Sequence, residues 1–123
     1  MSCESIMAGY KNLMVWHKAM LLTKEVYILT ENLPQSEKFG LVSQMRRCAV
    51  SVPSNIAEGS RRRTKKDFRS FLFIALGSCA ELETQISIIK MLRFVEETES
   101  VDRLLDEVMR MLNKLQHTLS QDS

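Results

Sequence analysis

The residues best suited to chemistry in this sequence are cations, and they gather between Gln44 and Arg69. This stretch holds eight of the seventeen Lys and Arg residues of the chain but only two acids, Glu58 and Asp67. Its local charge is +6, and because the whole chain carries +2, the remainder sums to −4. Lysine and arginine side chains bind anions, phosphate above all, through charge and hydrogen bonds. The pattern therefore indicates an anion-binding surface.

The position of these cations along an expected helix points the same way. Lys65 and Lys66 fall in its first turn, where the helix dipole disfavours cations by roughly 0.3–1 kcal/mol each at low salt. The Arg61–Arg63 run repels them across a short loop, and an anion bound at this helix N-terminus relieves both effects. We therefore predict a nucleic-acid-binding surface made of Arg47, Arg61, Arg62, Arg63, Lys65, Lys66 and Arg69.

The kind of contact follows from what accompanies these cations. No aromatic residue is interleaved in the run from Arg61 to Lys66 to stack on exposed bases. The sequence therefore favours contact with the phosphate backbone or a duplex over readout of bases. Such binding is expected to be weakly sequence-selective and to weaken steeply with salt.

Short polar residues cluster around Pro53 and resemble a catalytic group. A proline inside a helix removes one hydrogen bond and leaves a carbonyl unpaired, and short polar side chains commonly satisfy it. Gly59 follows where a left-handed residue would end the helix. We therefore assign structural roles in a helix kink and cap, rather than catalysis, to Ser51, Pro53, Ser54, Asn55, Glu58 and Gly59.

No constellation in the sequence indicates a metal, a cofactor or an enzyme. Di-iron bundles need Glu-x-x-His pairs, but Met14 and Lys114 stand three residues before His17 and His117. The four glycines are too scattered for a phosphate loop or a dinucleotide turn. No Ser or Cys nucleophile has a base nearby in sequence, although a triad assembled in space stays open. We predict no metal, no cofactor and no catalysis.

Composition and cysteines bound the class of protein. With 123 residues, 45% of them hydrophobic and 26% charged, the chain fits one globular domain. The odd set Cys3, Cys48 and Cys79 contains no CxxC pair, which is typical of a reduced protein with packing cysteines. The N-terminus has no signal-peptide pattern, and no segment approaches the roughly 18 continuous apolar residues of a membrane span. We predict a cytoplasmic protein without a membrane partner.

Four glycines and two prolines leave little material for turns, so long helices are expected. A first helix is predicted from about Leu13 to Asn32, because Pro34 pushes the residue before it out of the helical region. Ser36 is a plausible N-cap for a second helix. That helix carries an apolar stripe up to Ile56, and Pro53 predicts a kink or short break within it.

Thr64 and Asp67 resemble a capping box that opens a third helix. The third helix repeats apolar residues in steps of four and three, as in the seam of a coiled coil, at Phe68, Leu72, Ala75, Cys79, Leu82, Ile86 and Ile89. It is followed by an acidic hinge, Glu96–Glu99, and by a last helix that is expected to have Thr98 or Ser100 as its cap.

The third helix is apolar nearly all round, which is typical of a helix buried on more than one face. Its Glu81 and Glu83 are candidates to pair with Arg46 of the second helix, whereas Arg47 is expected in solvent. Short connections between four helices predict an all-α fold, an antiparallel up-and-down four-helix bundle. We expect it to span residues 12–120, after a flexible N-terminal lead of residues 1–11.

From Trp16 to Leu92 the chain resembles the bacterial 23S rRNA intervening-sequence proteins, a family of four-helix bundles. The string S-x-P-S-N-I-A-E-G-x-x-R is a highly specific part of this likeness, and Cys48 departs from the small Ala usual at its position. The matching segments are WHKAM (16–20), VYILT (26–30), FGLVSQMRR (39–47), SVPSNIAEGSRR (51–62) and FLFIALGSCAELE (71–83). The same fold resembles the accessory protein of diversity-generating retroelements, a homopentameric barrel that binds nucleic acid and a reverse transcriptase.

The resemblance implies an up-and-down bundle without catalysis and, by analogy, a ring-like homopentamer. Our first hypothesis is a homo-oligomer that binds RNA or DNA through the cations named above. The alternative is a protein-interaction scaffold or accessory subunit, for example of a reverse transcriptase, that docks an acidic partner.

Overall fold

Four long helices make up most of the chain in this computed structural model, which describes residues 9–121. The short η1 (Tyr10–Asn12) precedes α2 (Met14–Thr30), and η2 (Gln35–Glu37) with the π-helical η3 (Lys38–Val42) leads into α3 (Ser43–Ser60). The last two helices are α4 (Lys65–Met91) and α5 (Glu99–Gln121). No strand occurs within residues 9–121.

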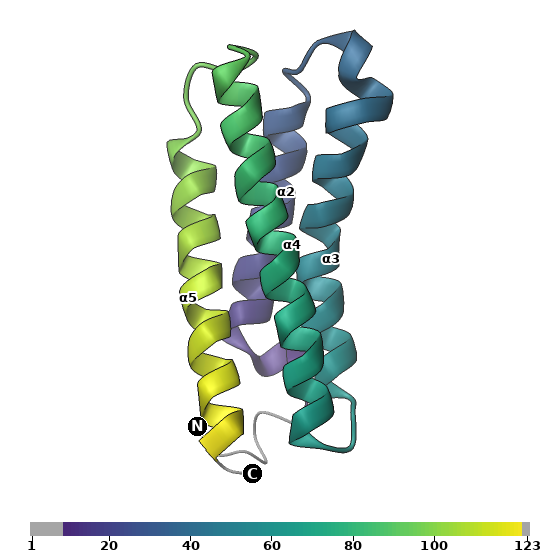
Figure 1. Ribbon diagram of the computed structural model, residues 1–123, viewed down its shortest axis with the longest axis vertical. Coiled ribbons are helices and arrows are strands. Elements are labelled where there is room, and N and C mark those ends of the chain that lie inside the picture. Colours follow the sequence, from purple (N-terminus) through teal and green to yellow (C-terminus); the bar gives the residue numbers. More distant parts are fainter. Residues whose placement is uncertain (1–8, 122–123) are drawn as a thin grey trace.

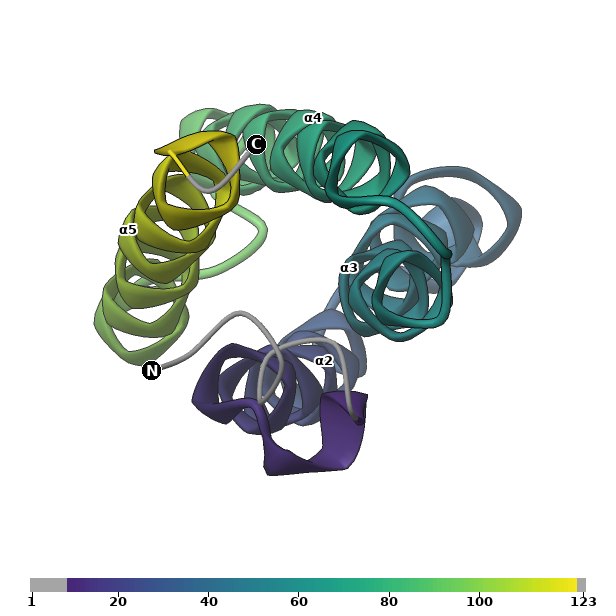
Figure 2. The same ribbon diagram turned by 90° about the horizontal axis from the view of Figure 1, so that it is seen from below.

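The helices run alternately up and down, so that neighbours in sequence are antiparallel neighbours in space (Figure 1). Viewed along the bundle, α2 packs against α3 and α5, and α4 packs against the same two helices from the opposite corner (Figure 2). The predicted all-α, antiparallel four-helix bundle is therefore confirmed. Residues 1–8 of the predicted N-terminal lead lie outside the described residues, whereas Tyr10–Asn12 form η1.

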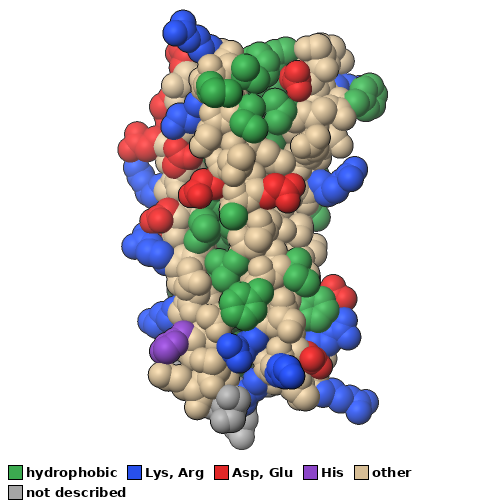
Figure 3. Space-filling view, viewed as in Figure 1, with side chains coloured by type: hydrophobic (Ala, Val, Ile, Leu, Met, Phe, Trp, Pro, Cys, Tyr) green, Lys and Arg blue, Asp and Glu red, His purple; other side chains and the backbone are tan. Residues whose placement is uncertain are grey.

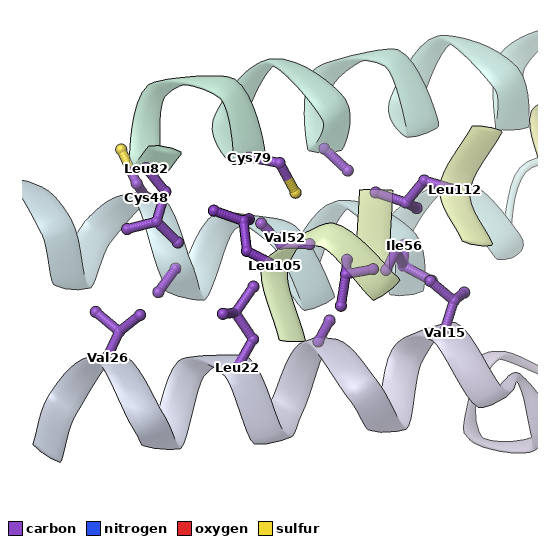
Figure 4. Packing of buried hydrophobic residues seen from close by; sticks show 14 of the residues in the cluster. Val15, Leu22, Val26, Cys48, Val52, Ile56, Cys79, Leu82, Leu105 and Leu112 are labelled. Carbon is purple, nitrogen blue, oxygen red and sulfur yellow. The ribbon is translucent and has the colours of Figure 1, made fainter. Parts of the chain in front are cut away.

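The apolar seam of α4 lies at the centre of the core. Each of its seven residues is at most 2% exposed, which confirms the heptad pattern from Phe68 to Ile89. Val15, Leu22 and Val26 of α2 point inward toward the other helices, as Figure 4 shows. Among the described helices, only α4 is long and apolar enough to cross a membrane by length and composition. A buried core helix can have the same two properties, and 39% of the most apolar 18-residue window of α4 is buried inside the bundle.

The start of α3 differs from the expected cap at Ser36. The Leu41 N–H donates a hydrogen bond to Glu37 Oε1 over 3.4 Å, and Glu37 is the N-cap of the π-helical η3. Within η3, Gly40 has non-helical backbone angles of φ −106° and ψ −108°. The chain therefore enters α3 through a kink at Gly40 that the apolar periodicity does not encode, and the Glu37 side chain caps the turn before it.

Pro53 does not break α3, which runs without interruption from Ser43 to Ser60. The carbonyl that a proline leaves unpaired belongs to the residue four positions earlier, here Ala49. The Thr23 hydroxyl of α2 lies 3.1 Å from the Ala49 oxygen and 2.9 Å from the Ala19 oxygen, so one proton serves both. A neighbouring helix thus supplies the donor, which the residues next to the proline could not reveal.

Gly59 does not end α3, because it lies inside the helix and no described glycine has a positive φ. Gly59 matters because it lacks a side chain where α3 and α4 are close together. A Cβ at Gly59 would lie 2.7 Å from Phe71 Cβ and 3.2 Å from the Phe68 carbonyl oxygen of α4. The missing side chain therefore allows α3 and α4 to approach closely just before the loop that joins them.

Candidate functional site

A short loop, residues 61–64, joins α3 to α4 and carries most of the predicted cations. Arg61 is the C-cap of α3, and the Arg62 N–H donates to the Gly59 carbonyl over 3.1 Å. At the other end the Thr64 hydroxyl accepts the Asp67 N–H over 3.1 Å, which confirms Thr64 as the cap of α4. We call the loop together with Lys65 and Lys66 the basic junction.

The basic junction lies at one end of the bundle. Arg61, Arg62, Arg63 and Lys66 are exposed, and Lys65 is half-buried. Basic side chains gather at the lower end of the face in Figure 3, with few acidic ones among them, whereas most acidic side chains lie higher. The N-terminus of α4, with its partial positive charge, opens at the same place.

Two arginines of the basic junction are held in place by aromatic rings. The Arg62 guanidinium lies 4.6 Å from the Phe71 ring centroid and forms an ion pair with Glu58 over 3.0 Å. The Arg61 guanidinium lies 5.3 Å from the ring centroid of Tyr10, which comes from η1. Cation–π contacts at exposed sites contribute about 0.5–1 kcal/mol each. These contacts limit the motion of both guanidinium groups while their outer edges stay accessible.

Arg69 lies one turn further along α4 and is partly committed to another helix. Its Nε and one terminal nitrogen donate to Gln116 Oε1 of α5 over 3.3 and 3.2 Å. The side chain is half-buried. Arg69 thus braces α4 against α5 at the edge of the basic junction and retains its charge there.

Arg47 lies apart from the other predicted cations. It is exposed, as expected, but it precedes Arg61 by 14 residues of the same helix, which is about 21 Å at the helical rise of 1.5 Å per residue. The structure therefore brings the predicted cations of the basic junction together with Arg69 and leaves Arg47 near the opposite end of α3.

Arg46 does not pair with Glu81 or Glu83. It points toward α2, where its Nε donates to Thr30 Oγ1 over 2.9 Å and a terminal nitrogen donates to the Tyr27 carbonyl over 3.3 Å. Its guanidinium also lies 4.5 Å from the Tyr27 ring centroid. The flank of the apolar stripe that carries Arg46 faces α2 rather than α4, and sequence periodicity alone could not decide between these two neighbours.

The polar residues around Pro53 form structural contacts. Asn55 Nδ2 donates to the Ser51 carbonyl over 2.8 Å and to its hydroxyl over 2.9 Å, and this hydroxyl lies 2.8 Å from that of Ser78 in α4. Ser54 is exposed, and Glu58 is paired with Arg62. This group therefore links α3 to α4 next to the site.

The buried cysteines are poor nucleophiles. Burial, together with the thiol hydrogen bond to Glu81 over 3.0 Å, raises the pKa of Cys48 to about 11. Burial raises the pKa of Cys79 to about 12. Thiolate, the reactive form, is therefore scarce at neutral pH. No group of three metal-ligating His, Cys, Asp or Glu residues occurs in the part of the chain that the structure describes.

Sequence reasoning missed two residues of the site, Tyr10 and Phe71. Tyr10 stands some fifty positions before Arg61 and reaches it only because η1 packs against the end of α3.

The chain is similar to one known protein family. The sequence profile of a family described as 23S rRNA-intervening sequence protein matches residues 11–114. No curated protein matches the chain.

Proposed function

Because the chain belongs to the 23S rRNA-intervening sequence protein family, we propose that it binds nucleic acid through the basic junction and does so without catalysis. The observation that carries this proposal is the convergence of five cations, from Arg61 to Lys66, on the N-terminus of α4. Helix N-termini and clustered arginines both favour phosphate. The phosphate backbone is the ligand that satisfies both.

Self-association is the second part of the proposal. Large apolar side chains are exposed on α2 and on α4. These two helices occupy opposite corners of the bundle (Figure 2). Leu21 and Ile28 of α2 are 48% and 52% exposed, and Phe73 and Ile74 of α4 are 50% and 52% exposed. Apolar side chains that form a contiguous exposed surface mark protein contacts, and we propose that these side chains do so. Two different patches on opposite sides suit a head-to-tail ring, in keeping with the pentamer that the resemblance implies.

A ring would repeat the basic junction on every subunit. Linked sites raise the effective concentration of each for the same nucleic acid, so modest affinity at one junction becomes strong overall binding. Bacterial cytoplasm is the setting in which such a protein would meet RNA or DNA. The alternative is that the chain is an interaction scaffold or accessory subunit, for example of a reverse transcriptase, and that an acidic protein partner occupies the same surface.

Fluorescence anisotropy with labelled RNA and DNA tests the proposal. We expect the logarithm of the binding constant to fall linearly with that of the salt concentration, by about 0.7–0.9 for each phosphate that is neutralised. Four contacts give a slope near −3. Affinity that is insensitive to salt would contradict backbone binding. A protein partner that stays bound after nuclease treatment, with no affinity for purified nucleic acid, would instead support the scaffold alternative.

A further inference from the structure

The π-helical entry to α3 exposes an aromatic residue that the bundle does not use. Phe39 is 89% exposed, although burying a phenylalanine stabilises a fold by about 1.5–3 kcal/mol. It stands beside Gly40, whose non-helical backbone marks a kink in the chain before α3. The local geometry therefore holds a large ring in solvent.

Phe39 lines a shallow groove of about 530 Å³ between the end of α2 and the start of α3. This volume lies within the range of about 300–1,000 Å³ for small-molecule sites. The groove has apolar walls from Tyr27, Phe39 and Val50, and its cations are Lys38, Arg46 and Arg47. No carboxylate is among its described lining residues.

The cations of this groove are arranged beside the rings. Arg46 is fixed by Thr30 and by the carbonyl and ring of Tyr27, and the Lys38 ammonium lies 5.6 Å from the Phe39 ring centroid. Arg47, which the basic junction leaves out, contributes its exposed guanidinium here. The groove therefore combines an accessible aromatic face with fixed positive charge.

We infer that this groove is a second subsite that binds one unstacked nucleotide of a single strand. The base stacks on Phe39, and its phosphate lies at Arg46 and Arg47. A nucleotide carries a planar ring and an anion within one unit, which matches the groove, and aromatic stacking beside cations is the usual mode of single-strand binding. A duplex keeps its base faces covered and could use only the cations.

This inference rests on the proposed function and deepens it. The basic junction binds any phosphate backbone, whereas the groove favours single strands. Arg47 then belongs to the nucleic-acid surface, as the sequence predicted, but through a different part of the bundle. An acidic peptide with an aromatic side chain is the competing occupant.

Anisotropy with two RNA probes, a labelled single-stranded oligouridylate and a labelled duplex of equal length, tests the inference. Phe39→Ala is expected to weaken single-strand binding by roughly 5- to 150-fold, the range for loss of one stacked base, and to leave duplex binding within about twofold. Phe39→Trp should keep the wild-type preference. Met91→Ala removes another exposed apolar side chain, 72% exposed at the end of α4, and should change neither affinity.

Unchanged single-strand affinity in Phe39→Ala would overturn the subsite. So would a Phe39-dependent affinity for a peptide of Glu and Phe with RNA binding unaffected. Failure of the proposed function looks different, because the wild-type protein would then bind neither probe. Since Phe39 is exposed, its replacement is not expected to unfold the protein.

Discussion

Replacing Arg61, Arg62 and Arg63 together with Glu is expected to lower nucleic-acid affinity by at least about 100-fold at physiological salt. The loss of three phosphate contacts accounts for this factor through counterion release alone. Repulsion between the new carboxylates and phosphate adds to it. Glutamates here lie before the N-terminus of α4, where negative charge is favourable, and at the C-terminus of α3, where it is unfavourable. Because the two effects oppose each other, most of the helicity should be retained in circular dichroism.

A matched control separates this effect from net charge. Lys24→Glu, Arg103→Glu and Arg110→Glu change the net charge by the same amount, but these residues lie on α2 and α5, outside the basic junction. The control should lower affinity by less than about tenfold, through the long-range field alone. If both triple variants lose affinity equally, the protein attracts nucleic acid by its overall charge and the basic junction is not the site.

Gly59→Ala is expected to destabilise the protein by up to about 2 kcal/mol, although alanine is the better helix former. The new Cβ would meet Phe71 Cβ and the Phe68 carbonyl, and overpacking of this kind costs about 1–3 kcal/mol. The intrinsic helix preference of alanine offsets about 1 kcal/mol of that cost. Urea unfolding measures the net change.

Gly77→Ala is the matched control, because Gly77 lies inside α4 and a Cβ there has nothing within 4 Å. Only the helix preference then acts, and we expect stabilisation by up to about 1 kcal/mol. The two substitutions should therefore have opposite signs. Equal stabilisation by both would mean that α3 and α4 do not pack as closely as Gly59 indicates.

Local and periodic patterns account for what the sequence predicted well. The heptad seam of α4 depends only on spacing along one helix, and the Thr64 cap depends on residues three apart. Both were confirmed for that reason. The four helices and their antiparallel order follow from such patterns together with short connections.

Two of the errors share one physical cause, which is that the deciding partner comes from another helix. Gly59 has the right place for a terminator, but Phe68 and Phe71 of α4 determine its role. The carbonyl freed by Pro53 receives its donor from Thr23 of α2. The predicted site also grouped Arg47 with Arg61 because both lie in one basic stretch of sequence. In the structure most of α3 separates these two residues.

The claim that nucleic acid occupies the basic junction is tested most directly by lysine reactivity. The protein is acylated with and without saturating RNA, and modification is measured by mass spectrometry at Lys66, with Lys24 and Lys90 as exposed references. We expect RNA to protect Lys66 at least about tenfold, since a contacted ammonium group is both neutralised and shielded, and to leave the references unchanged. Undiminished reactivity of Lys66 in the saturated complex would contradict the account.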